Sequence, residues 1–369
     1  MKLVATKNKR LRQMPAAPPA ASRREPSPPH TTLKRIADQL AVSMSTVSRV
    51  LSGQARRYRI SAQTETAVSN LARQFHFVPN QLARGLRLKK TLTVGLVIPD
   101  ISNPFFAGIA HQVALGARQH GYSILLCDSQ ENIELEVQAL GLLRHRQVEG
   151  LVLCPVGTSA AHLEDLAHTQ LPIVLVDRYF PELPLPYVAA DNLTGAREAT
   201  ELLIGNGHRC IACLQGVRGT SPNEFRVRGY QQALARHRLP VDASLIVGDS
   251  FGEQSGYIET KLLLRNRKDV TALFAFSNLL ALGALRALAE EHRRIPDDIS
   301  IIAFDDQPYA AYLATPMTTV AQPFSEMGDV AVKLLFDQIQ SPEREPTGGI
   351  LLPTNLIVRR SVKKIKRKE

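Results

Sequence analysis

The sequence predicts an α/β protein with a small helical head at its N-terminus and two lobes behind it, each a doubly wound parallel sheet. Residues 31–77 carry apolar side chains at helical spacing. From Leu92 onward, amphipathic stretches alternate with short apolar runs such as TVGLVIP and PIVLVD, a pattern typical of strands that helices cover on both faces. These strands are too numerous for one small sheet, which favours two lobes with a cleft between them.

Composition limits the classes of protein that this chain can represent. The 369 residues are enough for two or three domains. No apolar run reaches the roughly 18 residues of a membrane-spanning helix, and the basic N-terminus lacks the apolar core of a signal peptide. We therefore expect a cytoplasmic protein without membrane contact.

The four cysteines fall in apolar stretches that are typical of buried strands. They are Cys127, Cys154, Cys210 and Cys213. The last two have the spacing of a redox motif, but they lie within CIACL, and no second CxxC or His pair at zinc spacing accompanies them. We interpret all four as small buried hydrophobes in a reducing compartment, and we expect no metal or cofactor.

Charge is distributed unevenly along the chain. Residues 1–91 hold 18 Lys and Arg against three acids, a net charge of +15. The last eleven residues, RRSVKKIKRKE, carry +6, so the chain total of +11 leaves residues 92–358 at −10. A strongly basic head on an acidic body indicates a polyanionic partner for the head, although basic tails often serve only solubility.

Three short helices are predicted in the head, behind a proline-rich basic arm (1–30) that we expect to be disordered. The first helix has Leu33, Ile36, Ala37 and Leu40 on one face, with Thr31 or Thr32 as its N-cap. Ser43 is expected to cap a second helix, and Ser61 a third.

A three-residue turn, 41–43, joins the first two helices and gives them helix-turn-helix geometry, which places the second helix in the major groove of DNA. That helix turns Val47 and Val50 inward. Its outer face is small and polar, and it ends in an arginine long enough to reach a guanine edge or a phosphate. The alternative is a capped surface helix pair with no partner.

Several motifs then occur in one order along the chain: VSMSTVSRVL at 42–51, FVPN at 77–80, TVGLVIPDISNPFFAGI at 93–109, RVRGY at 226–230 and DISIIAFDD at 298–306. Together they resemble the LacI-type (lactose/purine/gluconate repressor) family of bacterial transcriptional regulators. The resemblance covers residues 32–360.

This resemblance implies a sequence-specific DNA-binding repressor whose operator affinity a small-molecule effector controls. It also implies a homodimer on a near-palindromic operator, without a membrane partner. The expected parts are a helix-turn-helix head (31–79), a hinge helix or linker (80–91), a periplasmic-binding-protein-like effector domain (92–360) and a basic tail (361–369). Within the effector domain we assign 92–190 and 322–345 to the first lobe, and 191–320 and 346–360 to the second.

The resemblance and the helix pattern together select the residues expected at DNA. They are Thr32, Ser43, Met44, Ser45, Thr46, Ser48 and Arg49 in the head, Arg56, Arg57, Tyr58 and Arg59 in a loop longer than in the lactose and purine repressors, and Asn80, Ala83, Arg84 and Leu86 in the hinge. Leu86 is expected to wedge into the minor groove; the alternative is an ordinary linker leucine.

One position departs from the family pattern at the turn between the helices. Ala41 stands where the family usually has glycine, and a left-handed backbone there would cost an alanine about 1 kcal/mol.

Ligands of such folds bind at the carboxyl ends of strands, between the lobes. The residues expected there are Phe105, Phe106, Asp177, Arg178, Arg226, Ser277, Asn278 and Asp305. Carboxylates and arginines at a cleft suit a sugar, sugar phosphate or sugar acid, although family members also sense purines. The alternatives are that Asp177 caps a helix, that Phe105 is core, and that Asp306 pairs with an arginine. At Asn278 the family commonly has Asp, which points to a different ligand chemistry or lobe contact.

Two further classes of protein match the sequence less well. An enzyme would need a catalytic motif, and the sequence has no phosphate loop, GxSxG elbow, HExxH or GxGxxG opening a helix. A free sugar-binding module for transport would fit the lobes alone, but the helix-turn-helix pattern argues against it.

Overall fold

The computed structural model describes residues 33–75, 77, 90–341, 343 and 348–365. The chain divides into two compact units with the boundary between Arg84 and Gly85, and each unit is described by itself. The arm at 1–30 and five residues expected at DNA lie outside the described residues: Thr32, Asn80, Ala83, Arg84 and Leu86.

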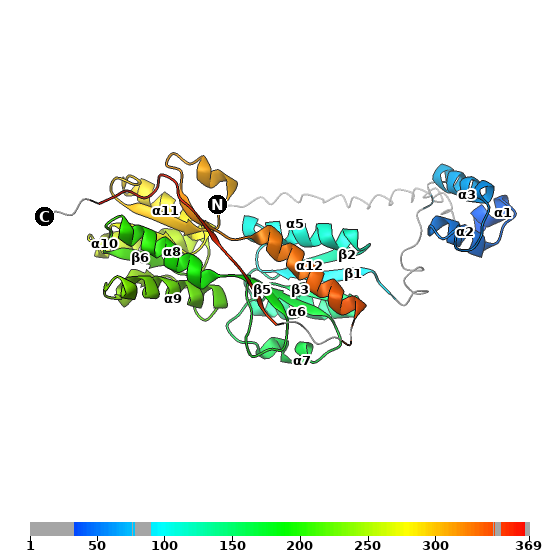
Figure 1. Ribbon diagram of the computed structural model, residues 1–369, viewed down its shortest axis with the longest axis horizontal. Helices are drawn as coiled ribbons and strands as arrows, with labels where there is room; N and C mark the ends of the chain where they lie inside the picture. The colour runs from blue at the N-terminus through cyan, green and yellow to red at the C-terminus, as the bar shows by residue number, and fades with distance from the viewer. Residues whose placement is uncertain (1–32, 76, 78–89, 342, 344–347, 366–369) are drawn as a thin grey trace, which may run out of the picture. The chain divides into compact units, whose positions relative to one another are not determined.

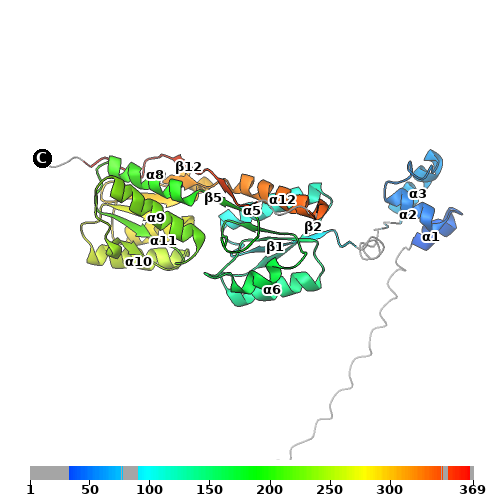
Figure 2. The ribbon, with the colours of Figure 1, turned by 60° about the horizontal axis from the view of Figure 1, so that its bottom comes forward.

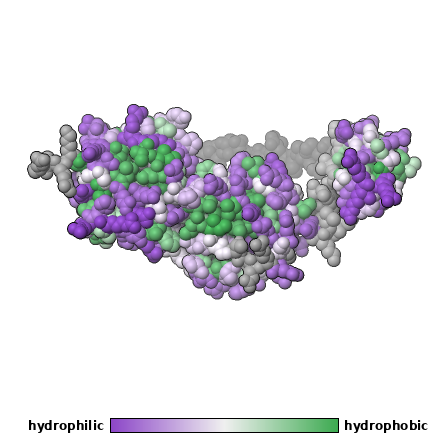
Figure 3. Space-filling view, viewed as in Figure 1, coloured by the Kyte–Doolittle hydropathy of each residue, from purple (hydrophilic) through white to green (hydrophobic). Residues whose placement is uncertain are grey.

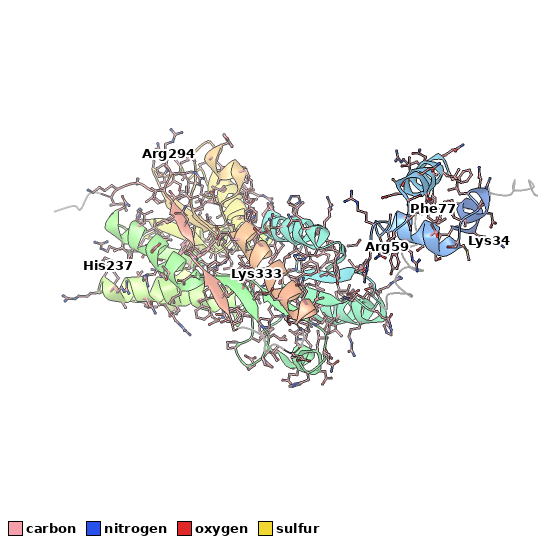
Figure 4. The ribbon with its side chains drawn as sticks, turned by 45° about the vertical axis from the view of Figure 1, so that its right-hand side comes forward. Lys34, Arg59, Phe77, His237, Arg294 and Lys333 are labelled. Atoms are coloured by element: carbon pink, nitrogen blue, oxygen red, sulfur yellow. The ribbon has the colours of Figure 1, made fainter. Side chains whose placement is uncertain are left out.

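The head contains three helices, α1 (Leu33–Gln39), α2 (Met44–Leu51) and α3 (Ala62–Gln74) (Figure 1). The two predicted caps are confirmed, since Ser43 Oγ accepts from Thr46 N at 3.0 Å and Ser61 Oγ accepts from Thr64 N at 3.2 Å. One small core joins the helices around the fully buried Ile36, Val47 and Val68. Phe77, after α3, also packs against this core (Figure 4).

The turn between α1 and α2 adopts the left-handed backbone that the sequence left open. Ala41 has a φ of 51°, and Gly53 after α2 has a φ of 70°. The alanine side chain is exposed, so packing does not compensate for the conformation.

Substituting Ala41→Gly is therefore expected to stabilise the head by about 1 kcal/mol. Hydrogen exchange of the α1 and α2 amides in the full chain measures this as slower opening. Gly53→Ala is the opposite change and serves as the control, because it places a Cβ on a left-handed residue that has open space around it. This variant should accelerate the exchange of the same amides. Equal exchange rates in both variants and the wild type would show that the backbone of Ala41 is not strained.

The first lobe is a six-stranded sheet in which every neighbouring pair is parallel. Its strand order is β11 (Ile350–Leu352), β5 (Tyr187–Ala190), β4 (Ile173–Val176), β3 (Gly150–Leu153), β1 (Thr93–Ile98) and β2 (Ser123–Asp128). The helices are α5 (Pro104–Gln119), α6 (Ile133–His145), α7 (Glu164–Ala167) with the 3₁₀ turn η1 (Ala161–Leu163), and α12 (Phe324–Gln340).

Alternate residues of β1 face two separate cores, as the strand period of two requires. Val94, Leu96 and Ile98 pack with α5 and α12. Val97 faces the opposite way and packs with α6. Both ribbon views show α5 and α12 side by side on one face of this sheet and α6 on the other (Figures 1 and 2). β1 is therefore covered on both sides, as its apolar sequence predicts.

The second lobe repeats the same strand arrangement. Its order is β12 (Asn355–Ile357), β10 (Thr318–Ala321), β9 (Ser300–Phe304), β8 (Ala272–Ala275), β6 (Ile211–Leu214) and β7 (Ile246–Val247), with only the β10–β12 pair antiparallel. The helices are α8 (Asn192–Gly205), α9 (Ser221–Arg236), α10 (Glu253–Asn266) and α11 (Asn278–Glu290), with 3₁₀ turns η2 (Ala243–Leu245) and η3 (Pro308–Ala311).

The chain passes between the lobes three times, between β5 and α8, between β10 and α12, and between β11 and β12. The third crossing corrects an expected boundary. Residues 346–360 were assigned to the second lobe, but β11 pairs with β5 in the first. The strand β11 has only three residues, and they are partly exposed, with Leu351 at 52%. The sequence therefore carries no burial pattern that shows which sheet this strand joins.

The expected tail boundary is also wrong at its beginning. Ser361 is fully buried in the second lobe, where its Oγ donates to the Ile301 carbonyl at 2.6 Å and accepts from Thr318 N at 2.8 Å. Composition alone does not reveal this anchor, because charged residues surround it in the sequence.

All four cysteines are free. Cys154 and Cys213 are buried, whereas Cys127 and Cys210 are only partly so, and Cys210 Sγ donates to Asp269 at 3.1 Å. Within the described part of the chain, no helix is long and apolar enough to cross a membrane, and no group of His, Cys, Asp and Glu could hold a metal ion.

Candidate functional site

The outer face of α2 has the composition that a helix in the major groove needs. Val47 and Val50 are buried against the head core. Ser43, Met44 and Ser45 are exposed, with Met44 at 55%, while Thr46, Ser48 and Arg49 are half-buried. The face of the head seen in Figure 3 is mostly hydrophilic. The residues of α2 that were predicted to contact DNA are thus all at least partly exposed.

The loop after α2 supports this surface from its C-terminal end. Ala55 is buried and anchors the loop, while Tyr58 is 43% exposed. The Arg49 guanidinium lies 4.0 Å from the centre of the Tyr58 ring, a cation–π contact that limits where this arginine can point. Arg56, Arg57 and Arg59 are exposed, and Arg59 is seen on the surface of the head in Figure 4, as is Lys34 of α1.

A cavity of about 140 Å³ lies between the two lobes of the large unit. Seven predicted residues line it: Phe105, Phe106, Asp177, Arg178, Arg226, Ser277 and Asp305. Every segment that contributes them follows the carboxyl end of a strand. The shared strand order of the two lobes brings these ends to one opening, at the position where open α/β sheets bind ligands.

Arg226 is held rigidly on the second-lobe side. It is 3% exposed, and its Nε donates to Asn192 Oδ1 at 2.8 Å while Nη1 donates to the Phe276 carbonyl. Its guanidinium lies 4.0 Å from the centre of the Phe304 ring. Burial lowers the pKa of Arg226, and Asp305 and Asp177 oppose that effect.

On the first-lobe side of the cavity, Asp177 and Arg178 follow directly after the end of β4. Asp177 has a left-handed φ of 68° and Asp305 one of 71°, which turns both carboxylates out of their strands. Asp177 is 4% exposed, and burial raises the pKa of its carboxyl to about 6, against the lowering effect of Arg178 and Arg226. Arg178 binds Glu131 in a bidentate pair, with N–O distances of 2.6 and 2.7 Å.

Asp305 lines the cavity and also binds two residues outside its own strand, Asn278 and Gln322. Its Oδ2 accepts from the backbone N of Asn278 at 3.2 Å, and its Oδ1 accepts from Gln322 Nε2 at 2.6 Å. Asn278 is 1% exposed and begins α11, so the carboxylate lies at a helix N-terminus, where negative charge is favoured. Gln322 belongs to the second crossing between the lobes, so Asp305 connects a ligand-facing position with a crossing segment.

Asn278 is not among the residues lining the cavity. Its Nδ2 points to Asn103 Oδ1 at 3.4 Å, and Asn103 is the N-cap of α5 in the first lobe. The sequence suggested that asparagine in place of the usual aspartate changes either the ligand chemistry or a contact between the lobes. In the structure, Asn278 makes a contact between the lobes. An aspartate here would bring a second carboxylate close to Asp305.

Two aspartates at strand ends have roles that the sequence left open. Asp177 is not a helix cap; it lines the cavity, with its Oδ2 3.9 Å from Arg178 Nε. Asp306 pairs with an arginine, Arg359, at 2.6 Å, and it does not line the cavity. Of these two carboxylates, only that of Asp177 is therefore placed to meet a ligand.

Phe105 and Ser277 each combine a structural contact with a place at the cavity. Phe105 belongs to the first-lobe core and also lines the cavity, 5.1 Å from the Phe106 ring in an edge-to-face pair. The Ser277 hydroxyl caps α11 and donates to the Phe251 carbonyl at 2.9 Å, so it is already engaged.

Three buried polar atoms around the cavity have no hydrogen-bond partner among the described residues: Asp177 Oδ1, Arg178 Nε and Gln322 Oε1. Their residues are 4%, 4% and 7% exposed. Buried polar groups are normally paired, because an unpaired one costs about 1–3 kcal/mol. These atoms indicate a place for a polar ligand.

Sequence reasoning missed several residues that line the cavity, among them Asn103, Glu131, Phe251 and Gln322. Glu131 had a weak signal, since it closely follows the end of β2. Gln322 follows β10 in the same way. Phe251 has no signal, because it belongs to a loop whose strand, β7, has only two residues.

Comparisons with known proteins agree with this arrangement. Residues 32–80 match the model of the bacterial regulatory proteins of the lacI family, and residues 200–362 match that of a periplasmic binding protein-like domain. The chain is 35% identical over 333 residues to the ribose operon repressor of Halalkalibacterium halodurans, covering 90% of this chain and 97% of that protein. The chain belongs to the LacI family.

Other LacI-family proteins extend the comparison. The regulator DegA of Bacillus subtilis is 35% identical over 90% of this chain and 98% of its own. A complex of the regulator CelR with cellobiose has a TM-score of 0.67 at 33% identity, and a lac repressor dimer bound to operator and the anti-inducer ONPF has one of 0.79 at 27%. Each of these two matches covers 90% of this chain and 99% of the chain in the solved structure. These relatives are transcriptional regulators, not enzymes, and this chain is a DNA-binding regulator of the same family.

Proposed function

We propose that this protein is a transcriptional repressor whose affinity for its operator is set by a sugar, sugar phosphate or sugar acid held between its lobes. The observation that carries the proposal is the cavity itself, which combines Asp177, Arg178 and Arg226 with buried polar atoms that lack partners among the described residues. Relatives named for ribose and a relative bound to cellobiose support a carbohydrate effector.

The effector acts on the lobes through the network that holds the cavity together. Asp305 contacts Gln322 in a crossing segment and Asn278 at the lobe contact, so a ligand that binds Asp305 changes both. The ligand shifts the population of lobe arrangements by its difference in affinity between them. The hinge residues, including Leu86, transmit this difference to the heads; their role at the minor groove stays a prediction.

The repressor acts as a homodimer on a near-palindromic operator. Apolar side chains exposed on both lobes support this part of the proposal: Leu125 and Leu126 on the edge strand β2 are 39% and 37% exposed, and Ile258 and Leu262 on α10 are 43% and 47% exposed. A monomer rarely leaves such side chains on a sheet edge uncovered. Analytical ultracentrifugation of the full chain gives the mass that tests it.

A ligand screen tests the regulatory proposal as a whole. Sugars, sugar phosphates, sugar acids and purines are compared for their effect on the melting temperature of the purified protein. The compounds that raise it are then tested for release of genomic operator fragments. A protein that prefers no duplex over random competitor, with or without any of these compounds, would contradict the proposal.

Effector affinity is expected to fall as the pH drops through about 6. The raised pKa of Asp177 leaves its carboxyl mostly ionised at pH 7 and mostly protonated at pH 5. Because the ionised form is the better acceptor for a ligand hydroxyl, we expect a loss of about tenfold between these pH values. Titration calorimetry measures it, and Asp177→Asn should bind more weakly and remove the slope. An affinity that rises toward pH 5 would show that the neutral acid is the binding form.

A further inference from the structure

The charges around the cavity are unbalanced. Four carboxylates line it, from Asp100, Glu131, Asp177 and Asp305, against the two guanidinium groups of Arg178 and Arg226. An anionic ligand therefore meets more negative charge than positive, in a confined space where charges interact more strongly than in water.

Arg178, the cation that an anionic ligand would need on the first-lobe side, is already neutralised. Both of its terminal nitrogens donate to Glu131, Nη1 to Oε2 at 2.7 Å and Nη2 to Oε1 at 2.6 Å. This is the geometry in which arginine binds carboxylates or phosphates. Glu131 thus takes the place that a phosphate would occupy on Arg178.

The backbone of the loop is adapted to present Glu131. Both Gln130 and Glu131 have left-handed φ values, 52° and 54°, which few residues other than glycine adopt without cost. Glu131 N donates to the Pro99 carbonyl at 3.0 Å, which ties the loop to the end of β1. The pair of Arg178 and Glu131 thus forms although Gln130 and Glu131 adopt an unfavourable backbone conformation, and we treat it as a structural part of the cavity.

The other positive groups at the cavity are partly engaged. Nε and Nη1 of Arg226 donate to Asn192 and to the Phe276 carbonyl, and the negative charges of Asp305 and Asp177 stabilise its charged form. The N-terminus of α11, a natural site for a phosphate, is occupied by Asp305 Oδ2. Among the described residues that line the cavity, the buried side-chain atoms without a hydrogen-bond partner are one carboxylate oxygen, one N–H and one amide oxygen, a set that suits hydroxyl groups.

We infer that the cavity accepts an uncharged, hydroxyl-rich ligand and rejects its phosphorylated and carboxylate forms, and that Glu131 sets this preference by neutralising Arg178. The inference rests on the proposed function and narrows its three ligand classes to one. Glu131 is a specificity-determining residue at the entrance of the site, since its side chain is 35% exposed while that of Arg178 is 5% exposed.

The experiment compares each neutral sugar with its own anionic derivatives. Titration calorimetry on the full-length protein uses D-ribose with D-ribose 5-phosphate and D-ribonate, and D-glucose with D-glucose 6-phosphate and D-gluconate. The variants are Glu131→Gln, which keeps the side-chain shape and an acceptor for Arg178, and Glu134→Gln. Glu134 is exposed in the first turn of α6 and does not line the cavity, so its variant is matched in charge change and neighbourhood.

In the wild type a neutral sugar should bind at least about tenfold more tightly than its anionic forms. Glu131→Gln should raise the affinity for the anionic forms relative to the neutral sugar by about tenfold, and Glu134→Gln should leave the ratio unchanged. An anionic form that binds the wild type as tightly as its neutral parent, or a ratio that Glu131→Gln does not alter, would overturn the inference and leave the proposed function standing. A wild type that binds no compound of either series would overturn both.

Discussion

An Arg226→Ala variant is expected to lose the effector response while its effector-free form still binds operator with nearly wild-type affinity. The substitution removes a guanidinium that lines the cavity and is held by Asn192 and Phe276. A charge-assisted hydrogen bond contributes roughly 1.5–3 kcal/mol, so the loss of even one such bond to the ligand weakens effector binding by at least about tenfold. A dose-response curve of operator release against effector measures it.

Two further variants separate binding from folding at this position. Arg226→Met keeps a long side chain against the Phe304 ring and still removes the donors, so it should reproduce the loss of response with less loss of stability. Arg228→Ala is the matched control, because Arg228 is exposed on the same helix two residues away. A wild-type dose response in either Arg226 variant would remove this residue from the site.

An Arg49→Ala variant is expected to lose about ten- to a hundredfold in affinity for an operator selected from a random duplex pool. Arg49 ends the polar face of α2, and its contact with the Tyr58 ring directs its guanidinium. An arginine that reads a base edge contributes roughly 1–3 kcal/mol of discrimination. Fluorescence anisotropy with the selected operator and with random duplex measures both affinities.

The comparison of the two duplexes distinguishes base reading from phosphate binding. A base contact lowers the specific affinity alone, whereas a phosphate contact lowers both affinities and reduces the salt dependence by about one unit of slope. Tyr58→Ala should give a smaller loss of the same kind, because Arg49 then keeps its charge but not its orientation. Arg73→Ala, at an exposed position in the last turn of α3, controls for the charge of the head. Undiminished operator binding by Arg49→Ala would contradict the role of α2.

Much of the architecture could be predicted because its causes are local. Ser43 and Ser61 mark the starts of their helices, since a side-chain oxygen at an N-cap satisfies a backbone donor of the first turn. The buried strands are indicated by continuous apolar runs such as Thr93–Ile98. Seven of the eight residues expected at the effector cavity line it, because strand ends of this fold converge there.

The features that escaped prediction depend on residues distant in sequence. The pair of Arg178 with Glu131 joins the ends of two strands 47 residues apart, and nothing near either residue signals the other. Asn278 was placed at the ligand, but it contacts Asn103, 175 residues away, because the approach of the lobes decides its partner. β11 joined a different lobe from the one expected, since three partly exposed residues carry too little pattern to choose a sheet.

The interleaving of the two lobes has a consequence for how the chain is made. α12 and β11 complete the first lobe, yet they leave the ribosome after every strand of the second lobe except β12. Until Phe324–Gln340 emerges, the apolar face around Val94 and Leu96 has no α12 to cover it, and nascent chains at that stage should recruit chaperones. A premature stop codon after Ala321 would thus leave the first lobe, which is translated first, without α12 and β11. The released fragment would be a substrate for quality-control proteases.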